Sequence, residues 1–271
     1  MMKSPLVSSD WLLKNLSDPD LIILDASQQD NKAGLASDLN KLQIIGARIF
    51  DIKNKFSATN SPFPNTLLEP EEFQEKCREL GIHNSSKIVI YDNLGVYTGP
   101  RVWWMFKIMG FDNIAVLDGG LPDWIANGYK VQESVQTTFK HGNFKAIFDS
   151  NKVRDFEFLT ENIALKSSLV IDARSADRFN GITPEPRKGL RGGNIPNSIN
   201  IPFTEVLENG KFKTPDKLVK LFKRFEIENH PLVFSCGSGI TACIILLAAD
   251  LVLHNKKALY DGSWTEWAQL S

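Results

Sequence analysis

Residues 231–241 read Pro-Leu-Val-Phe-Ser-Cys-Gly-Ser-Gly-Ile-Thr, and this stretch decides the fold class. The apolar run at 232–234 is typical of a buried strand, and the small residues after it lead into a long apolar segment at 241–253 that has the length of a helix. A strand that passes directly into a helix is the building unit of α/β proteins. The stretch therefore predicts a parallel sheet covered by helices.

The chain is a diverged duplication of this pattern. Segment 21–27 recurs at 169–175, segment 87–92 recurs at 231–236, and segment 117–124 recurs at 260–267, in the same order and at nearly constant spacing. Asp25 thereby corresponds to Asp172, Asp92 to Cys236 and Trp124 to Trp267. We expect two homologous domains, at residues 1–135 and 153–271. A polar linker without clear periodicity is expected from about residue 129 to 153.

Each half alternates between strand and helix patterns. Short runs rich in Ile and Val predict buried parallel strands at 21–24, 87–91 and 114–117. Amphipathic or apolar segments predict helices at 71–80, 101–109, 215–225 and 241–253. The expected fold class is α/β, with a mostly parallel sheet in each half and helices on both faces of it.

The composition of the 271 residues limits the classes of partner and the compartment. Lysine and arginine number 31 against 32 acidic residues, a balance that argues against nucleic acid as a main partner. The apolar run at 240–253 is too short for a bilayer and contains Asp250, and residues 1–5 lack the apolar core of a signal peptide, so no membrane association is expected. Three cysteines cannot build a disulfide framework, which favours the cytoplasm.

Cys236 is the residue with the clearest chemical potential. It lies where a strand ends and a helix begins, which is the crevice in which α/β proteins bind ligands. Gly237 and Gly239 let successive N–H groups gather around one centre, and the helix N-terminus favours negative charge there. Such a cradle would stabilise a thiolate nucleophile. The alternative is that Cys236 is a small buried apolar residue and that the glycines only shape a turn.

Two familiar chemistries use a cysteine loop of this kind, namely phosphate-ester hydrolysis and sulfur transfer. A cysteine phosphatase needs an arginine after five intervening residues, and this chain has Ala242 there. The loop 236–241 on the second of two homologous halves closely resembles the active loop of tandem-domain rhodanese-type sulfurtransferases, nearest to the 3-mercaptopyruvate branch. Three further blocks support the resemblance: 178–187 with its two arginines, 99–104, and the Asp-Gly-x-x-x-x-Trp end of both halves.

The resemblance implies two rhodanese-like domains with catalysis in the second. Cys236 would take a sulfane sulfur from 3-mercaptopyruvate as a persulfide and pass it to cyanide or to a thiol, such as a small thiol or thioredoxin. Arg178 and Arg187 would bind the carboxylate and carbonyl of the donor, a task that suits a planar guanidinium. No metal or organic cofactor is implied. A solvated loop is the alternative for the two arginines.

The remaining loop residues bear on the choice of donor. Thiosulfate-using relatives carry basic residues directly after the cysteine, whereas this chain has Gly237 and Ser238, which favours 3-mercaptopyruvate. Ser238 is expected to donate a hydrogen bond to the donor or to take part in proton transfer, with a loop-capping hydroxyl as the alternative. Ile240 completes the loop, and Thr241 is expected to cap the following helix.

The chain also departs from the family pattern. Asn65 and Lys53 fall where the mercaptopyruvate branch has a histidine and an aspartate that support the loop serine, and Asn cannot act as a general base. Asp92 stands at the cysteine position of the first half, which should therefore be catalytically inert. Two alternatives stay open: the same chemistry with thiosulfate as donor, and a non-catalytic rhodanese-like binding module.

Overall fold

The computed structural model describes residues 2–227 and 230–271, which fall into two compact units. The first unit contains the chain up to Ala58 together with Leu67–Phe148 and Asn209–Lys211. The second contains Thr59–Thr66, Asp149–Glu208 and Phe212–Ser271. The short segment Thr59–Thr66 thus belongs to the second unit although it lies in the first half of the sequence.

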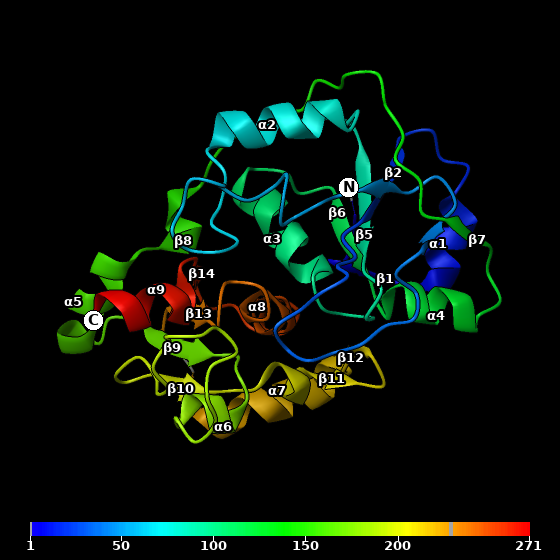
Figure 1. The fold of residues 1–271 in the computed structure, drawn as a ribbon. Helices are drawn as coiled ribbons and strands as arrows, with labels where there is room; N and C mark the ends of the chain where they lie inside the picture. Colours follow the sequence, from blue (N-terminus) through cyan, green and yellow to red (C-terminus); the bar gives the residue numbers. More distant parts are fainter. Residues whose placement is uncertain (1, 228–229) are drawn as a thin grey trace. The chain divides into compact units, whose positions relative to one another are not determined.

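The first unit is built on a five-stranded parallel sheet in the order β1-β6-β5-β2-β4. Figure 1 labels four of these strands, β1, β2, β5 and β6. Its central strands are apolar on both faces, as expected for a sheet covered by helices on each side. A separate antiparallel pair joins β3 to β7. The strands are β1 Leu6–Val7, β2 Leu21–Asp25, β3 Leu42–Ile44, β4 Arg48–Ile49, β5 Lys87–Tyr91, β6 Ile114–Leu117 and β7 Val131–Glu133; the helices are α1 Ser9–Asn15, α2 Pro70–Glu79, α3 Gly99–Ile108 and α4 Gly120–Ala126.

The second unit repeats the arrangement with the parallel strand order β10-β9-β13-β14-β8. In the reverse direction, from β8 to β10, these strands correspond one by one to β1, β6, β5, β2 and β4, so the duplication in the sequence is a duplication of topology. The strands are β8 Val153–Arg154, β9 Leu169–Asp172, β10 Ile199–Asn200, β11 Leu207–Glu208, β12 Lys211–Phe212, β13 Leu232–Ser235 and β14 Lys257–Tyr260; the helices are α5 Phe156–Leu165, α6 Ala176–Phe179, α7 Pro215–Phe222, α8 Ala242–Asp250 and α9 Ser263–Leu270, with 3₁₀ turns at Ser150–Lys152, Phe203–Val206 and Lys223–Phe225.

The segment expected to be a linker is largely part of the first unit. Residues up to Phe148 are grouped with that unit, and β7 pairs with β3. Phe144 is fully buried and packs edge-on against Phe73 and Phe106 within a cluster of phenylalanines. A polar composition concealed these contacts, because a short strand and one large aromatic ring suffice to anchor the segment.

Candidate functional site

Cys236 lies at the carboxyl end of β13, where the chain turns through the loop 236–241 into α8. Its side chain is buried, with 1% of the residue exposed, and the thiol is free. Gly239 adopts a φ of 77°, which lets the loop turn tightly between strand and helix. The helix α8 is apolar on all sides and buried from Ala242 to Ala249, so it anchors the loop in the core of the second unit.

Ser263 holds the loop from the direction of α9. Its hydroxyl oxygen accepts hydrogen bonds from the amides of Cys236, at 3.2 Å, and Gly239, at 3.1 Å, and its hydroxyl donates to the Tyr260 carbonyl at 2.9 Å. Ser263 is fully buried and has a φ of 53°, in the left-handed region where a non-glycine residue is strained. The hydroxyl thus occupies two amides of the loop that the sequence predicts to form a cradle around the sulfur.

Both arginines that the sequence singled out lie against the loop. A side chain at Gly237 would meet Arg178 Nη2 at 3.0 Å and Arg187 Nη1 at 3.9 Å, so the glycine leaves room for the two guanidinium groups. Arg187 Nη2 donates to the hydroxyl of Ser238 at 3.1 Å. Arg178 forms an ion pair with Glu185, with 2.5 Å between Nη2 and Oε2, and is half-buried. Arg187 is therefore the arginine that donates a hydrogen bond to a loop residue.

Ser238 receives a second hydrogen bond from Asn65. The amide nitrogen Nδ2 of Asn65 donates to the Ser238 hydroxyl at 3.0 Å and to the Ser238 carbonyl at 3.1 Å. A hydroxyl oxygen accepts two hydrogen bonds and donates one. With Asn65 and Arg187 as its donors, Ser238 has its own hydrogen left to offer to a bound molecule.

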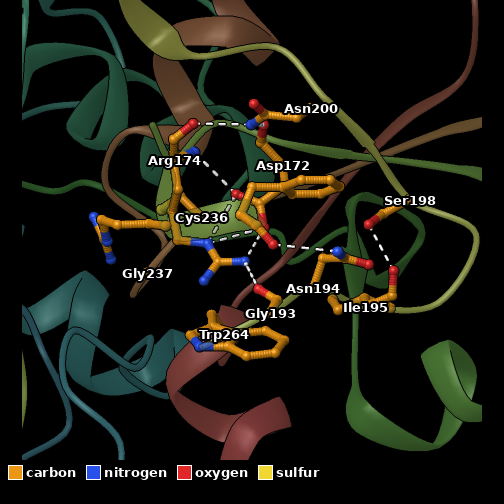
Figure 2. A network of polar contacts seen from close by, with 12 residues as sticks. Asp172, Arg174, Gly193, Asn194, Ile195, Ser198, Asn200, Cys236, Gly237 and Trp264 are labelled. Atoms are coloured by element: carbon orange, nitrogen blue, oxygen red, sulfur yellow. Dashed lines mark hydrogen bonds and ion pairs between the residues drawn. The ribbon is translucent and has the colours of Figure 1, made fainter. Parts of the chain in front are cut away.

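Sequence reasoning missed Arg174, the centre of the polar network in Figure 2. Its side chain is fully buried, binds Asp172 at 2.7 Å and Glu185 at 2.8 Å, and donates to the Gly193 carbonyl. Its guanidinium lies 4.4 Å from the centre of the Trp264 ring. Burial by itself lowers the pKa of Arg174, but the carboxylates of Asp172 and Glu185 have the larger effect, so the pKa is raised.

This network positions Arg178, because Glu185 binds Arg174 with Oε1 and Arg178 with Oε2. The duplication contained a signal for the role of Arg174. The first half has Ser27 at the corresponding position, and an arginine in place of a serine at the end of a strand indicates a local charge pair.

The structure also locates three other residues that the sequence singled out. Thr241 stands directly before α8, but its side chain makes no capping hydrogen bond, so the prediction that it caps the helix was wrong. Its backbone is already helical, and a capping side chain requires extended backbone at that position. Lys53 is exposed on the first unit. Asp92 follows β5 as Cys236 follows β13, and burial raises the pKa of this carboxyl group.

The described part of the chain holds no group of three or more His, Cys, Asp or Glu side chains arranged to bind a metal ion. In residues 2–227 and 230–271 no helix has the length and apolar character needed to cross a bilayer. The other two cysteines are buried: burial raises the pKa of the Cys77 thiol well above its ordinary value, and Cys243 donates from its sulfur to the Gly239 carbonyl.

Comparison with known proteins matches both halves to one family. The rhodanese-like domain matches residues 8–127 and 155–270. A thiosulfate/3-mercaptopyruvate sulfurtransferase of Arabidopsis thaliana is 38% identical over 97% of this chain and 84% of its own length. The 3-mercaptopyruvate sulfurtransferase of Mus musculus is 38% identical over 97% of this chain and 91% of its own. The crystal structure of SseA from Escherichia coli, a 3-mercaptopyruvate sulfotransferase, superposes with a TM-score of 0.84 at 34% identity and covers 97% of this chain and 99% of that one.

Proposed function

The chain belongs to the tandem-domain rhodanese-type sulfurtransferases, and from this premise we propose that it moves a sulfane sulfur from 3-mercaptopyruvate through a persulfide on Cys236 to a thiol or cyanide. The observation that carries the proposal is the contact of Arg187 with Ser238 in the loop that begins at Cys236. It sets a cationic, bidentate donor beside the nucleophile, as an anionic 2-oxo acid requires.

The chemistry proceeds in two displacements on sulfur. The Cys236 thiolate attacks the sulfur of 3-mercaptopyruvate, an S–S bond forms, and the C–S bond breaks. The electron pair of that bond passes into the enolate of pyruvate, which then takes up a proton. In the second displacement cyanide or a thiolate attacks the outer sulfur of the persulfide, leaves with it as thiocyanate or a new persulfide, and restores the Cys236 thiolate.

The loop and the arginines divide the recognition of the anion between them. Since Ser263 occupies the amides of Cys236 and Gly239, the negative charge on sulfur is met by the other loop amides and by the N-terminus of α8. Arg187 and Arg178 take the carboxylate and carbonyl of the donor. Gly237 is part of this arrangement, because a Cβ there would lie only 3.0 Å from Arg178 Nη2, which would then have to shift.

Ser238 acts as a hydrogen-bond donor toward the bound substrate. Asn65 and Arg187 both donate to its oxygen, so the serine is oriented but not deprotonated by its neighbours. Asn65 thereby positions Ser238 as the histidine does in related enzymes, but it transfers no proton. The proton for the enolate then comes from solvent or from the substrate thiol.

The first domain, residues 1–135, would carry no sulfur, because Asp92 occupies the cysteine position. Catalysis would rest with residues 153–271. A small thiol or thioredoxin is the acceptor we favour, since a persulfide is discharged by a thiolate. Three free, buried cysteines suit a reducing compartment, and we propose the cytoplasm as the location.

Thiosulfate is the second donor to consider, because the Arabidopsis relative is named for both substrates. Two arginines and a neutral loop suit the monoanionic 2-oxo acid better than a dianion. Thiocyanate formation from each donor in turn, followed in wild type, Cys236→Ser and Cys243→Ser, tests the proposal. We expect a higher kcat/KM with 3-mercaptopyruvate, loss of activity in Cys236→Ser only, and pyruvate equal to thiocyanate. No turnover of either donor by the wild type would favour a non-catalytic binding module.

A further inference from the structure

The first unit contains a cavity of about 150 Å³ at the carboxyl ends of β2, β4 and β5. Its lining includes Asp25, Ser27, Asn40 and Asn93. A cavity of this size takes up a molecule of about six non-hydrogen atoms, such as benzene. In an open parallel sheet this edge is where ligands bind. No role for this cavity follows from the sulfur-transfer chemistry of the second unit.

Two lining residues present polar atoms that have no partner. Within residues 2–227 and 230–271, neither the Asn93 side-chain oxygen nor the Ser27 hydroxyl has a hydrogen-bond partner, although both atoms are buried. Asn93 is only 2% exposed. Its amide nitrogen donates to the Gln28 carbonyl at 3.4 Å and to Asn40 Oδ1 at 2.5 Å, so Oδ1 is the atom left to accept a hydrogen bond from a ligand.

The charge that lines the cavity is negative. None of its lining residues is a lysine or an arginine, and Asp25 is only 5% exposed. It accepts hydrogen bonds from the Ser27 amide at 2.9 Å and from the Tyr91 hydroxyl at 2.8 Å. Burial raises the pKa of Asp25, and a cation at the cavity would reverse that penalty.

The duplicated half indicates which cation fits. Asp172 corresponds to Asp25 and makes the same turn: its carboxylate accepts the amide two residues on, at 2.9 Å in both halves. In the second unit that next residue is Arg174, whose guanidinium is bound by Asp172. In the first unit it is Ser27, whose side chain carries no positive charge to pair with its aspartate. The cavity lies where the second unit keeps a guanidinium group.

We propose that this cavity is a binding site for a guanidinium group, held by Asp25, Asn93 and Ser27. The five N–H donors of a guanidinium match the carboxylate, the amide oxygen and the hydroxyl of these residues. The group arrives either on a small guanidino compound or on an arginine side chain of another protein. Both sources present the same chemistry to the cavity.

Nuclear magnetic resonance of the ¹⁵N-labelled full chain tests the site with millimolar methylguanidinium. Urea serves as the neutral molecule of the same shape, and tetramethylammonium as a cation without N–H donors. We expect saturable shifts of the Asn93 and Asn40 side-chain amides with methylguanidinium, binding of urea at least about 10-fold weaker, and no saturable shift with tetramethylammonium. N-acetyl-arginine methylamide separates the two sources, because it binds as well as methylguanidinium only where an arginine residue fits.

Variants decide whether the shifts arise in the cavity. Ser27→Arg copies the second half, so it should abolish methylguanidinium binding, whereas Ser85→Arg adds the same charge at an exposed position of the same unit and should leave it intact. Asp25→Asn keeps the shape of the carboxyl group and should weaken binding about 10-fold, which tests the site even where Ser27→Arg does not fold. Equal, non-saturating responses to all three probes, or shifts that persist unchanged in Asp25→Asn, would overturn the proposal and leave water as the occupant.

Discussion

The loops after β5 and β13 occupy the same position in the two sheets but are organised in opposite ways. In the first, Asp92 Oδ2 accepts the amides of Tyr97, Thr98 and Gly99 at 2.8, 2.9 and 2.9 Å. The loop is folded around its own carboxylate. In the second, the Ser263 hydroxyl, which lies outside the loop, accepts two loop amides.

The two loops also differ in the residue at the start of the helix that packs against each of them. Gly120 corresponds to Ser263, and the two have nearly equal φ values of 55° and 53°. A Cβ at Gly120 would come within 2.5 Å of the Asp92 carbonyl oxygen, so the first unit has no space for a serine there. The second unit keeps a strained serine because its hydroxyl takes the place of the internal carboxylate. The comparison teaches that the cradle can serve a substrate only when its support comes from outside the loop.

Replacing Cys236 by the residue of the first half gives the largest expected effect. In Cys236→Asp a carboxylate fills the loop and carries no sulfur, so kcat/KM for 3-mercaptopyruvate should fall at least about 1000-fold. Cys243→Ser is the matched control, since a serine there still donates to the Gly239 carbonyl and activity should persist. Retained turnover in Cys236→Asp would contradict the assignment of the nucleophile.

Arg187→Met removes the cation that contacts the second loop. A hydrogen bond to a charged group contributes about 1.5–3 kcal/mol, so kcat/KM for 3-mercaptopyruvate should drop about 10- to 100-fold. Lys188→Met changes the same charge at the exposed neighbouring position and should have little effect. Steady-state kinetics of both variants make the comparison, and equal losses would mean that only net charge matters.

Ser263 tests whether external support of the loop matters for the reaction. Ser263→Ala keeps the left-handed strain and leaves two buried amides without an acceptor, each of which costs about 1–3 kcal/mol of unfolding free energy. Ser263→Gly loses the same hydrogen bonds but relieves about 1 kcal/mol of strain, so it should be the more stable of the two.

Both Ser263 variants should lower kcat to a similar extent, because both release the same loop amides. Urea unfolding and steady-state kinetics on the same samples separate stability from activity. A kcat that followed stability, with the glycine variant near wild type, would mean that the serine supports only the fold.

The smallest expected effect concerns Asp25, which has Ser27 where Asp172 has its arginine. Burial raises the pKa of Asp25 above its ordinary value of 3.8. Between pH 3.8 and the pKa of the folded state, the folded protein therefore binds more protons than the unfolded chain. Unfolding free energy should then fall as pH rises from about 3.8 through the folded pKa. In Asp25→Asn this component disappears, so the variant should gain on the wild type with rising pH. A difference independent of pH in urea unfolding would refute the effect.

The sequence predicted the sheets well, because buried parallel strands are short apolar runs. The bounds at Lys87–Tyr91 and Ile114–Leu117 agree with expectation, whereas the helix ends shift by one residue at Pro70–Glu79 and by up to three at Pro215–Phe222 and Ala242–Asp250. The duplication carried the prediction of two α/β domains.

The hydrogen-bond partners of the loop could not be predicted in the same way. Ser263 reaches the loop because its backbone is left-handed, which the sequence does not reveal. Arg174 contacts Gly193 and Trp264, which lie far from it in the sequence and approach it only in the folded chain. Aligning the two halves would have flagged both positions, since the first half has Gly120 and Ser27 there. The position of Asn65 in the sequence indicated that it would lie near Ser238. That its amide donates a hydrogen bond to the Ser238 hydroxyl could be seen only in the structure.

Mass spectrometry of the reduced protein after brief exposure to 3-mercaptopyruvate tests most directly that the second loop carries sulfur and the first does not. The account predicts a gain of one sulfur atom, mapped to the peptide containing Cys236, absent in Cys236→Ser and discharged by cyanide as thiocyanate. A protein that gains no sulfur, or that gains it on Cys77 or Cys243 while Cys236 stays unmodified, would contradict the account.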